Sequence, residues 1–213
     1  MLRSPRPGAA SGCGLGNVTR LDTNTINGAT IRTDGIDFNA EYKFRDVWGG
    51  TLKIGGDATY VHKYQTGALS VAGIQVQDPF NAVGFLNYQT TAYPLPRWKG
   101  SAFIEYNHGI HNIRATLHYI QGYTDQRTDV FATGAFFDTS KNPVTVLAGK
   151  NIGSFTTVDL AYRAVLPWNT TLSLAATNLF DRDPPFARLD LNYDPFTASS
   201  LGRVIKIGID HKF

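Results

Sequence analysis

The chain has 213 residues, of which 42% are hydrophobic and 17% charged, with a net charge of +3 and one cysteine, Cys13. The basic residues are scattered and cannot neutralise a row of phosphates, so no nucleic-acid partner is expected. One cysteine cannot form an internal disulfide. No apolar run approaches the ~20 residues that a membrane-spanning helix requires.

Alternating apolar and polar residues recur along the chain and predict β-strands, because successive side chains of a strand point to opposite faces. The first clear strand is predicted at residues 35–44 and the second at 51–64, after the turn sequence RDVWGG. In both, apolar side chains take one face and charged side chains the other. Residues 17–26 form a weaker candidate for an additional strand.

A hairpin is predicted next, with strands at 97–107 and 110–123 and a two-residue turn at 108–109. The apolar residues are even-numbered in its first strand and odd-numbered in its second. A two-residue turn requires this change of parity. The register that follows pairs Ile104 with Ile113.

Three more strands are predicted at 155–164, 170–178 and 201–213, which brings the clear strands to seven. The last one reads LGRVIKIGIDHKF and has two chemically distinct faces. Its apolar face holds Ile205, Ile207, Ile209 and Phe213, and its polar face holds Lys206, Asp210 and Lys212. One face suits lipid and the other suits water.

The connections between these strands alternate in length. Those at 45–50, 108–109 and 165–169 are short, whereas those at 65–96, 124–152 and 179–200 are long. Outer-membrane barrels have short periplasmic turns and long extracellular loops. A β-sandwich also has alternating strands and is the main alternative fold.

Two further features favour a barrel over a sandwich. The predicted strands of about 12 residues exceed the ~5–6 residues usual in soluble sheets, and aromatic residues gather near the strand ends on the apolar side. The sequence therefore predicts an all-β fold: an antiparallel transmembrane β-barrel segment, seven to eight strands of a larger barrel, with short periplasmic turns and long extracellular loops. Lipid is expected to contact the isoleucine row, and water the charged face.

The stretch AATNLFDRDPPFARLDLNYDPFTASSLGRVIKIGIDHKF resembles the end of TonB-dependent outer-membrane receptors, with NLFD after a strand, then PP, YDP, GR and a terminal Phe. Upstream, NGATIRTDGIDFNAEYKF and PLPRWKGSAFIEYN are similar to parts of the same barrel. The resemblance covers about residues 17–213. Its motif residues are Asn178, Leu179, Phe180, Asp181, Gly202, Arg203 and Phe213.

The resemblance implies a barrel of about 22 strands with a plugged lumen in the outer membrane of a Gram-negative bacterium. Such a receptor takes up a scarce nutrient of the siderophore–iron, cobalamin or oligosaccharide class with energy delivered through TonB. No signal peptide, plug domain or TonB box is recognisable here. We therefore expect residues 17–213 to be the C-terminal part of the barrel, not functional alone, and residues 1–16 to be a disordered or non-native end.

The expected partners are outer-membrane lipid, the missing plug and barrel strands, the TonB complex and an unidentified small-molecule substrate. Two alternative functions stay open: a small self-contained outer-membrane barrel, porin-like or structural, and a soluble β-sandwich binding module. Sequence upstream of this chain would distinguish the first of these from a receptor segment.

No enzyme activity and no catalytic, cofactor or metal site is predicted, because no nucleophile and base, paired carboxylates or metal-ligand cluster is assembled by the spacing. The charged face is expected to be a solvated wall with cross-strand pairs, or a contact for the plug; its residues are Lys53, Asp57, Glu105, Arg114, Asp159, Arg163, Lys206 and Asp210. The long connections combine aromatic surface with charge and supply the candidate substrate-binding residues, which are Tyr88, Tyr93, Arg127, Phe136, Phe137 and Arg188.

Overall fold

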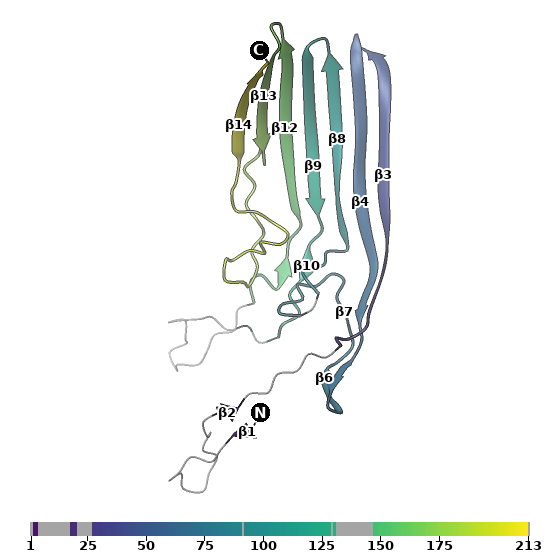
Figure 1. Cartoon of the computed structure of the whole chain (residues 1–213), viewed down its shortest axis with the longest axis vertical. Coiled ribbons are helices and arrows are strands. Elements are labelled where there is room, and N and C mark those ends of the chain that lie inside the picture. The colour runs from purple at the N-terminus through teal and green to yellow at the C-terminus, as the bar shows by residue number, and fades with distance from the viewer. Residues whose placement is uncertain are drawn as a thin grey trace.

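The structure, a computed structural model, describes residues 2–3, 18–20, 27–90, 92–128, 130 and 147–212. Its main feature is an antiparallel sheet of long strands in the order β14-β13-β12-β9-β8-β4-β3 (Figure 1). These strands are β3 (Ile31–Val47), β4 (Gly50–Thr66), β8 (Trp98–His108), β9 (His111–Ile120), β12 (Phe155–Leu166), β13 (Thr170–Thr177) and β14 (Val204–His211). The seven strands predicted from alternation are confirmed.

The other described strands are short. β7 (Phe80–Asn81) pairs with the end of β4, and three two-stranded sheets complete the described strands. They are formed by β1 (Leu2–Arg3) with β2 (Val18–Arg20), β5 (Leu69–Val71) with β6 (Ile74–Gln77), and β10 (Tyr123–Thr124) with β11 (Asn151–Ile152). Within the weak candidate at 17–26, the described strand is β2, and it pairs with β1 and not with the main sheet.

The predicted register of the β8–β9 hairpin is wrong by two residues. His108 pairs with His111, so the turn is formed by Gly109 and Ile110, and Ile104 lies opposite Ala115. Gly109 has a φ of +56°, which a glycine adopts without strain at the first central position of a type II′ hairpin turn. A shift of two residues leaves every side chain on its predicted face, because the period of a strand is two.

The apolar face of the main sheet is exposed. Ile205, Ile207 and Ile209 on β14 are 69%, 72% and 73% exposed. Aromatic pairs lie toward both ends of this face. The ring centroids of Tyr60 and Trp98 lie 4.6 Å apart near the loop end, and those of Trp48 and Tyr106 lie 6.4 Å apart at the turn end. Among the described residues, no second layer covers the isoleucine row, so the sandwich alternative is not found.

The buried hydrophobic cluster lies in the connections. Leu86, Tyr123, Ile152 and Ala187 pack together, although they come from three different connections. These connections meet at the end of the sheet opposite the short turns (Figure 1). No helix in the described part of the chain is long and apolar enough to cross a membrane.

Candidate functional site

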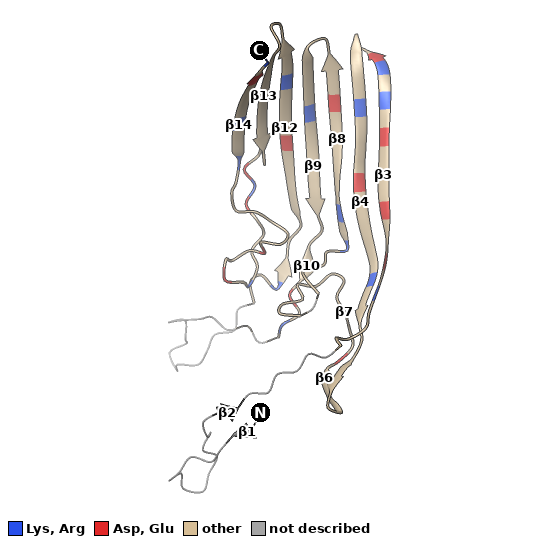
Figure 2. Ribbon diagram, in the orientation of Figure 1, with Lys and Arg blue, Asp and Glu red and all other residues tan. Residues whose placement is uncertain are grey.

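The face opposite the isoleucine row carries paired charges. Arg114 contacts Glu105 at 3.3 Å, Lys53 contacts Glu41 at 2.8 Å, and Asp159 lies 3.2 Å from His118. Both acidic and basic residues lie along β3, β4, β8 and β12 (Figure 2). The predicted cross-strand pairing is therefore present for these residues.

An aromatic ring interrupts this charged face. Phe103 has the Arg114 guanidinium 3.8 Å from its ring centroid and the Lys53 ammonium at 5.6 Å. Cations over an aromatic face are attracted to its negative quadrupole, which explains how Phe103 fits among polar neighbours. Asp57 instead accepts a hydrogen bond from Ser101 at 2.6 Å. Among the described residues, Arg163, Lys206 and Asp210 form no ion pair.

The NLFD and GR motif residues form one connection between the end of β13 and the start of β14. Asn178 exchanges hydrogen bonds of 2.9 Å with the backbone of Arg182, which closes a tight turn. Asp181 then accepts a 2.7 Å hydrogen bond from the backbone N–H of Arg203. Gly202 has a φ of +63°, and a Cβ there would lie 2.6 Å from Asp181 Oδ1. The spacing of NLFD and GR thus has a structural cause.

The remaining motif residues are less constrained. Leu179 donates its backbone N–H to Val158 at 2.7 Å, and the Phe180 side chain is exposed. Phe213 lies outside the described residues.

A buried ion cluster fixes two of the long connections to each other. Asp125 accepts hydrogen bonds from Arg127 Nη2 at 2.7 Å and from Arg188 Nε at 3.0 Å. The side chains of Asp125 and Arg188 are 0% and 1% exposed. Burial opposes ionisation of this carboxyl, but the hydrogen bonds from Arg127 and Arg188 outweigh it and hold the pKa of Asp125 below its usual value.

A second buried contact lies beside the first. Tyr123 donates a hydrogen bond to the Asp194 carboxylate, and its hydroxyl also lies 2.7 Å from Thr197 Oγ1. Burial and the Asp194 carboxylate raise the pKa of Tyr123 well above its usual value. Asp194 also accepts a 3.0 Å hydrogen bond from the backbone of Phe196. The two contacts hold the 179–200 connection against β10.

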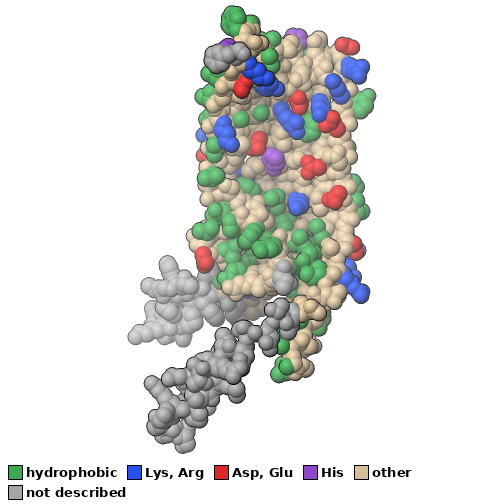
Figure 3. Space-filling view, in the orientation of Figure 1, with side chains coloured by type: hydrophobic (Ala, Val, Ile, Leu, Met, Phe, Trp, Pro, Cys, Tyr) green, Lys and Arg blue, Asp and Glu red, His purple; other side chains and the backbone are tan. Residues whose placement is uncertain are grey.

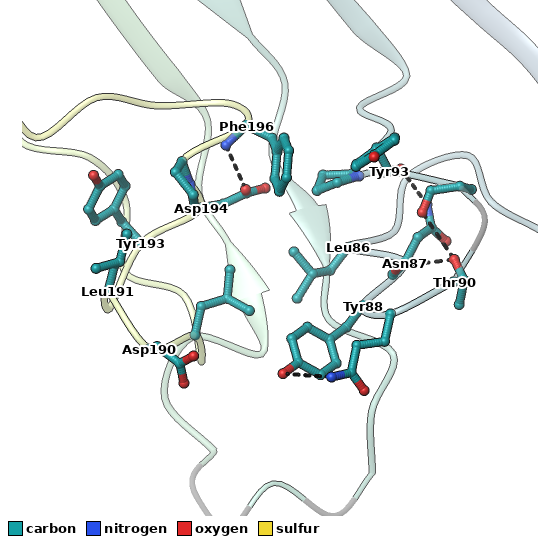
Figure 4. Close-up of a pocket in the computed structure, with 15 residues that line it drawn as sticks. Leu86, Asn87, Tyr88, Thr90, Tyr93, Asp190, Leu191, Tyr193, Asp194 and Phe196 are labelled. Atoms are coloured by element: carbon teal, nitrogen blue, oxygen red, sulfur yellow. Dashed lines mark hydrogen bonds between the residues drawn. The ribbon is translucent and has the colours of Figure 1, made fainter.

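A pocket of about 400 Å³ opens where these connections meet. Segments 86–94 and 189–196 form opposite walls of the pocket. The Leu86 side chain points from the first wall toward the second, and Tyr93 lies beside Phe196 at one end (Figure 4). The ring centroids of Tyr93 and Phe196 lie 5.1 Å apart. The volume falls within the ~300–1,000 Å³ typical of ligand sites. Hydrophobic side chains also gather at this end of the molecule in the space-filling view (Figure 3).

Two of the candidate substrate-binding residues, Tyr88 and Tyr93, line this pocket. Arg127 does not line it but lies 4.0 Å from the Tyr88 ring centroid. Arg188 is buried against Asp125, and Phe136 and Phe137 lie outside the described residues. Sequence reasoning missed Leu86, Asp190, Leu191, Tyr193 and Phe196, which complete much of the lining. The described residues contain no group of three or more potential metal ligands.

Comparison with known proteins identifies the barrel family. The family model for the TonB dependent receptor-like β-barrel matches residues 3–179. The match ends at Leu179, so most of the stretch that carries the NLFD-to-Phe resemblance lies beyond it. Neither the curated proteins nor the solved structures gave a match to this chain. With most of its length matched and a long-stranded antiparallel sheet, the chain belongs to the TonB-dependent receptor β-barrel family, an outer-membrane receptor family of Gram-negative bacteria.

Proposed function

We propose that this chain forms part of the wall of an outer-membrane receptor that imports a scarce, bulky nutrient with energy delivered through TonB. The observation that carries the proposal is the two-sided sheet, in which the isoleucine row is exposed and the opposite face is charged. Lipid would contact the first face and a water-filled or plugged lumen the second. The short turns would then face the periplasm and the long connections the outside.

The direction of the edge strands supports a partner that supplies further strands. β3 and β14 are the first and seventh members of an antiparallel sheet, so they run in the same direction. They therefore cannot close the sheet by pairing antiparallel with each other. A second copy placed in the same membrane orientation would meet the same obstacle. An odd number of additional strands would solve it, as in a barrel of about 22 strands.

The unpaired edges also carry an energetic cost. Each backbone group left without a hydrogen bond in hydrocarbon costs several kcal/mol, and both edges expose many. We expect the isolated chain to aggregate in detergent or to require companion strands. A monodisperse, folded monomer in detergent would contradict this expectation.

Siderophore–iron complexes, cobalamin and oligosaccharides are the substrate classes that we propose, because the family resemblance implies them. The remaining assignments are likewise proposals: TonB and a plug domain as partners, residues 17–213 as the C-terminal part of the barrel, and residues 1–16 as a disordered or non-native end. We propose no catalytic role.

A chimaera tests the proposal. Residues 27–213 would replace the last seven strands of a 22-stranded receptor of this family, and a control chimaera would carry only residues 48–213, which omits β3. We expect the first chimaera to reach the outer membrane as a heat-modifiable, protease-resistant barrel. The control, with one strand fewer, should fail to close.

Epitope insertions then test the orientation. Gly73, in the β5–β6 turn, and Gly109, in the β8–β9 turn, both have open space where a side chain would begin. An antibody should bind the Gly73 insertion on intact cells and the Gly109 insertion only after permeabilisation. Equal reactivity of the two sites, or recovery of both chimaeras in the soluble fraction, would refute the proposal.

A further inference from the structure

Several polar side chains that line the pocket are already occupied by internal hydrogen bonds. The amide of Asn87 donates to the carbonyls of Ala82 and Tyr93 at 2.9 and 3.1 Å. Thr90 Oγ1 donates to backbone carbonyls at 3.0 Å, and Asp194 is held by Tyr123 and Phe196. These groups shape the walls and leave few hydrogen-bonding positions for a ligand.

Most of the remaining surface of the pocket is apolar or aromatic. The contributing side chains are Leu86, Tyr88, Ala92, Tyr93, Pro94, Leu189, Leu191, Tyr193, Pro195 and Phe196. A densely hydroxylated ligand would lose hydration there without regaining its hydrogen bonds. This composition disfavours an oligosaccharide and favours a ligand with an apolar or aromatic ring body.

The charges that the described residues bring to the pocket lining are negative. They are the carboxylates of Asp190 and Asp194, and no described Lys, Arg or His lines the pocket. Arg127 and Arg188 lie outside the lining and share one carboxylate, that of Asp125. Asp190 is exposed and has no ion pair with another described residue. An anionic ligand would meet the Asp190 and Asp194 carboxylates with no cation in the described lining to compensate.

The aromatic side chains of the pocket also favour a cationic ligand. Tyr93, Phe196 and Tyr88 keep exposed ring surface at the pocket, and an aromatic face attracts a cation. Arg127 already occupies one face of Tyr88 in this way, at 4.0 Å. In Figure 4, Asp190 and Tyr88 lie toward the same end of the pocket, so a positive group and a ring could be bound together there.

From this geometry we infer that the pocket binds a small organic cation, or the cationic ring-bearing part of a larger nutrient. The inference rests on the proposed function only in placing the pocket on the outer side of the membrane. It selects among the substrate classes by disfavouring anionic chelates and oligosaccharides.

Three probes with the same ring test the charge preference: 1-naphthylmethylamine, 1-naphthylmethanol and 1-naphthoate. Each would be dialysed to equilibrium against outer membranes that contain the chimaera with residues 27–213, with membranes that contain the unaltered host receptor as the blank. We expect the amine to bind about two- to fivefold more tightly than the alcohol, and the carboxylate to bind most weakly. Maltotriose should show no binding above the blank.

Variants assign the effect to the pocket. Asp190→Asn should reduce the preference for the amine over the alcohol, and Phe196→Ser should weaken the binding of both. Asp183→Asn and Leu147→Ser change exposed residues outside the lining and should leave all three affinities unchanged. Protease resistance of each variant would verify that it is folded.

Two results would overturn the inference: a carboxylate that binds as well as the amine, or no binding of any probe above the blank. If the epitope experiment succeeds and the amine shows no preference, this inference alone fails. If the Gly73 and Gly109 epitopes report no outer-membrane orientation, the proposed function fails whatever the probes do.

Discussion

The strands and the connections of this molecule hold their apolar residues in opposite ways. On β14 the isoleucine row is largely exposed, at 69–73%, whereas Leu86 in the connections is only 2% exposed and packs against Tyr123 and Ile152. Burial from water stabilises apolar surface by ~25 cal/mol per Å². The connections obtain that stabilisation within the chain, and the strands must obtain it from a surrounding medium.

Ion pairs also differ between the two regions: those on the sheet are partly exposed, and the Asp125–Arg188 pair in the connections is buried. On the sheet, ion pairs such as Arg114 with Glu105 are partly exposed, and pairs of this kind contribute only about 0–1 kcal/mol. In the connections, Asp125 and Arg188 are fully buried, so loss of either partner leaves a buried charge. The comparison predicts that the connections are sensitive to lost ion pairs and that the strands are sensitive to charges placed on the apolar face.

The largest effect is expected for Asp125→Ala. Removal of the carboxylate takes its ion pair from the buried Arg188 guanidinium, which costs about 3–5 kcal/mol. Hydrogen exchange at the amides of Leu86 and Thr124, which bond across the connections, would measure the local free energy of unfolding. Asp183→Ala removes an exposed carboxylate and serves as the control. Equal amide protection in the two variants would show that the cluster does not hold the connections together.

A charge on the apolar face should be the next most damaging change. Ile207→Lys places a cation at the middle of β14 on the face assigned to lipid, at a cost of about 2–4 kcal/mol. Ser173→Lys, on the opposite face of β13, should cost less than about 1 kcal/mol. Urea unfolding of the chimaera in lipid vesicles would give both values. A larger loss for Ser173→Lys would reverse the assignment of the two faces.

The motif connection should respond less strongly. Gly202→Ala places a side chain at a φ of +63° and within 2.6 Å of Asp181 Oδ1, and a non-glycine residue in this region costs about 1–3 kcal/mol. Gly73→Ala has a similar φ of +79° with nothing nearby. The difference between the two variants, again from urea unfolding, isolates the contact with Asp181. If they are equally destabilised, close approach is not the reason for glycine in the GR motif.

Acid should loosen the connections by the smallest amount. The folded-state pKa of Asp125 is lowered, so its stabilisation is complete above the unfolded pKa of about 4 and is lost as the pH falls through the folded pKa. A protonated Asp125 carboxyl still accepts a hydrogen bond through its carbonyl oxygen. Asp125→Ala removes that acceptor, so the effect of acid stays below that of the substitution. Proteolysis at stepped pH would follow the loss, and Asp125→Asn should abolish this component of the pH dependence.

The strands could be predicted from sequence because alternation is a local property. Each predicted strand needed only its own residues, and the two faces survived even where the register was wrong. The register of β8 and β9 depended on the position of Gly109 within the turn, first or second, and the alternation was compatible with both. The face on which each side chain lies was therefore predictable, and the residue that pairs with Ile104 was not.

The pocket was predictable only in part. Aromatic and charged side chains in a long connection predict Tyr88 and Tyr93, which do line it, but the same pattern also predicts Arg188, which is buried against Asp125. Those two partners are 63 residues apart in sequence, and nothing local to either residue indicates the pairing. Nothing in the sequence distinguishes Leu86 and Phe196 from other apolar residues in loops. Their place in the pocket follows only from the way the folded connections meet.

Site-directed spin labelling along β14 tests the central claim most directly. In a cysteine-free version of the membrane-inserted chimaera, single cysteines at residues 205 to 209 would be spin-labelled, and their accessibility to oxygen and to a nickel chelate compared. We predict a period of two: labels at Ile205, Ile207 and Ile209 favour oxygen, and labels at Lys206 and Gly208 favour the chelate. A profile without alternation, or one in which the isoleucine positions favour the chelate, would contradict the account.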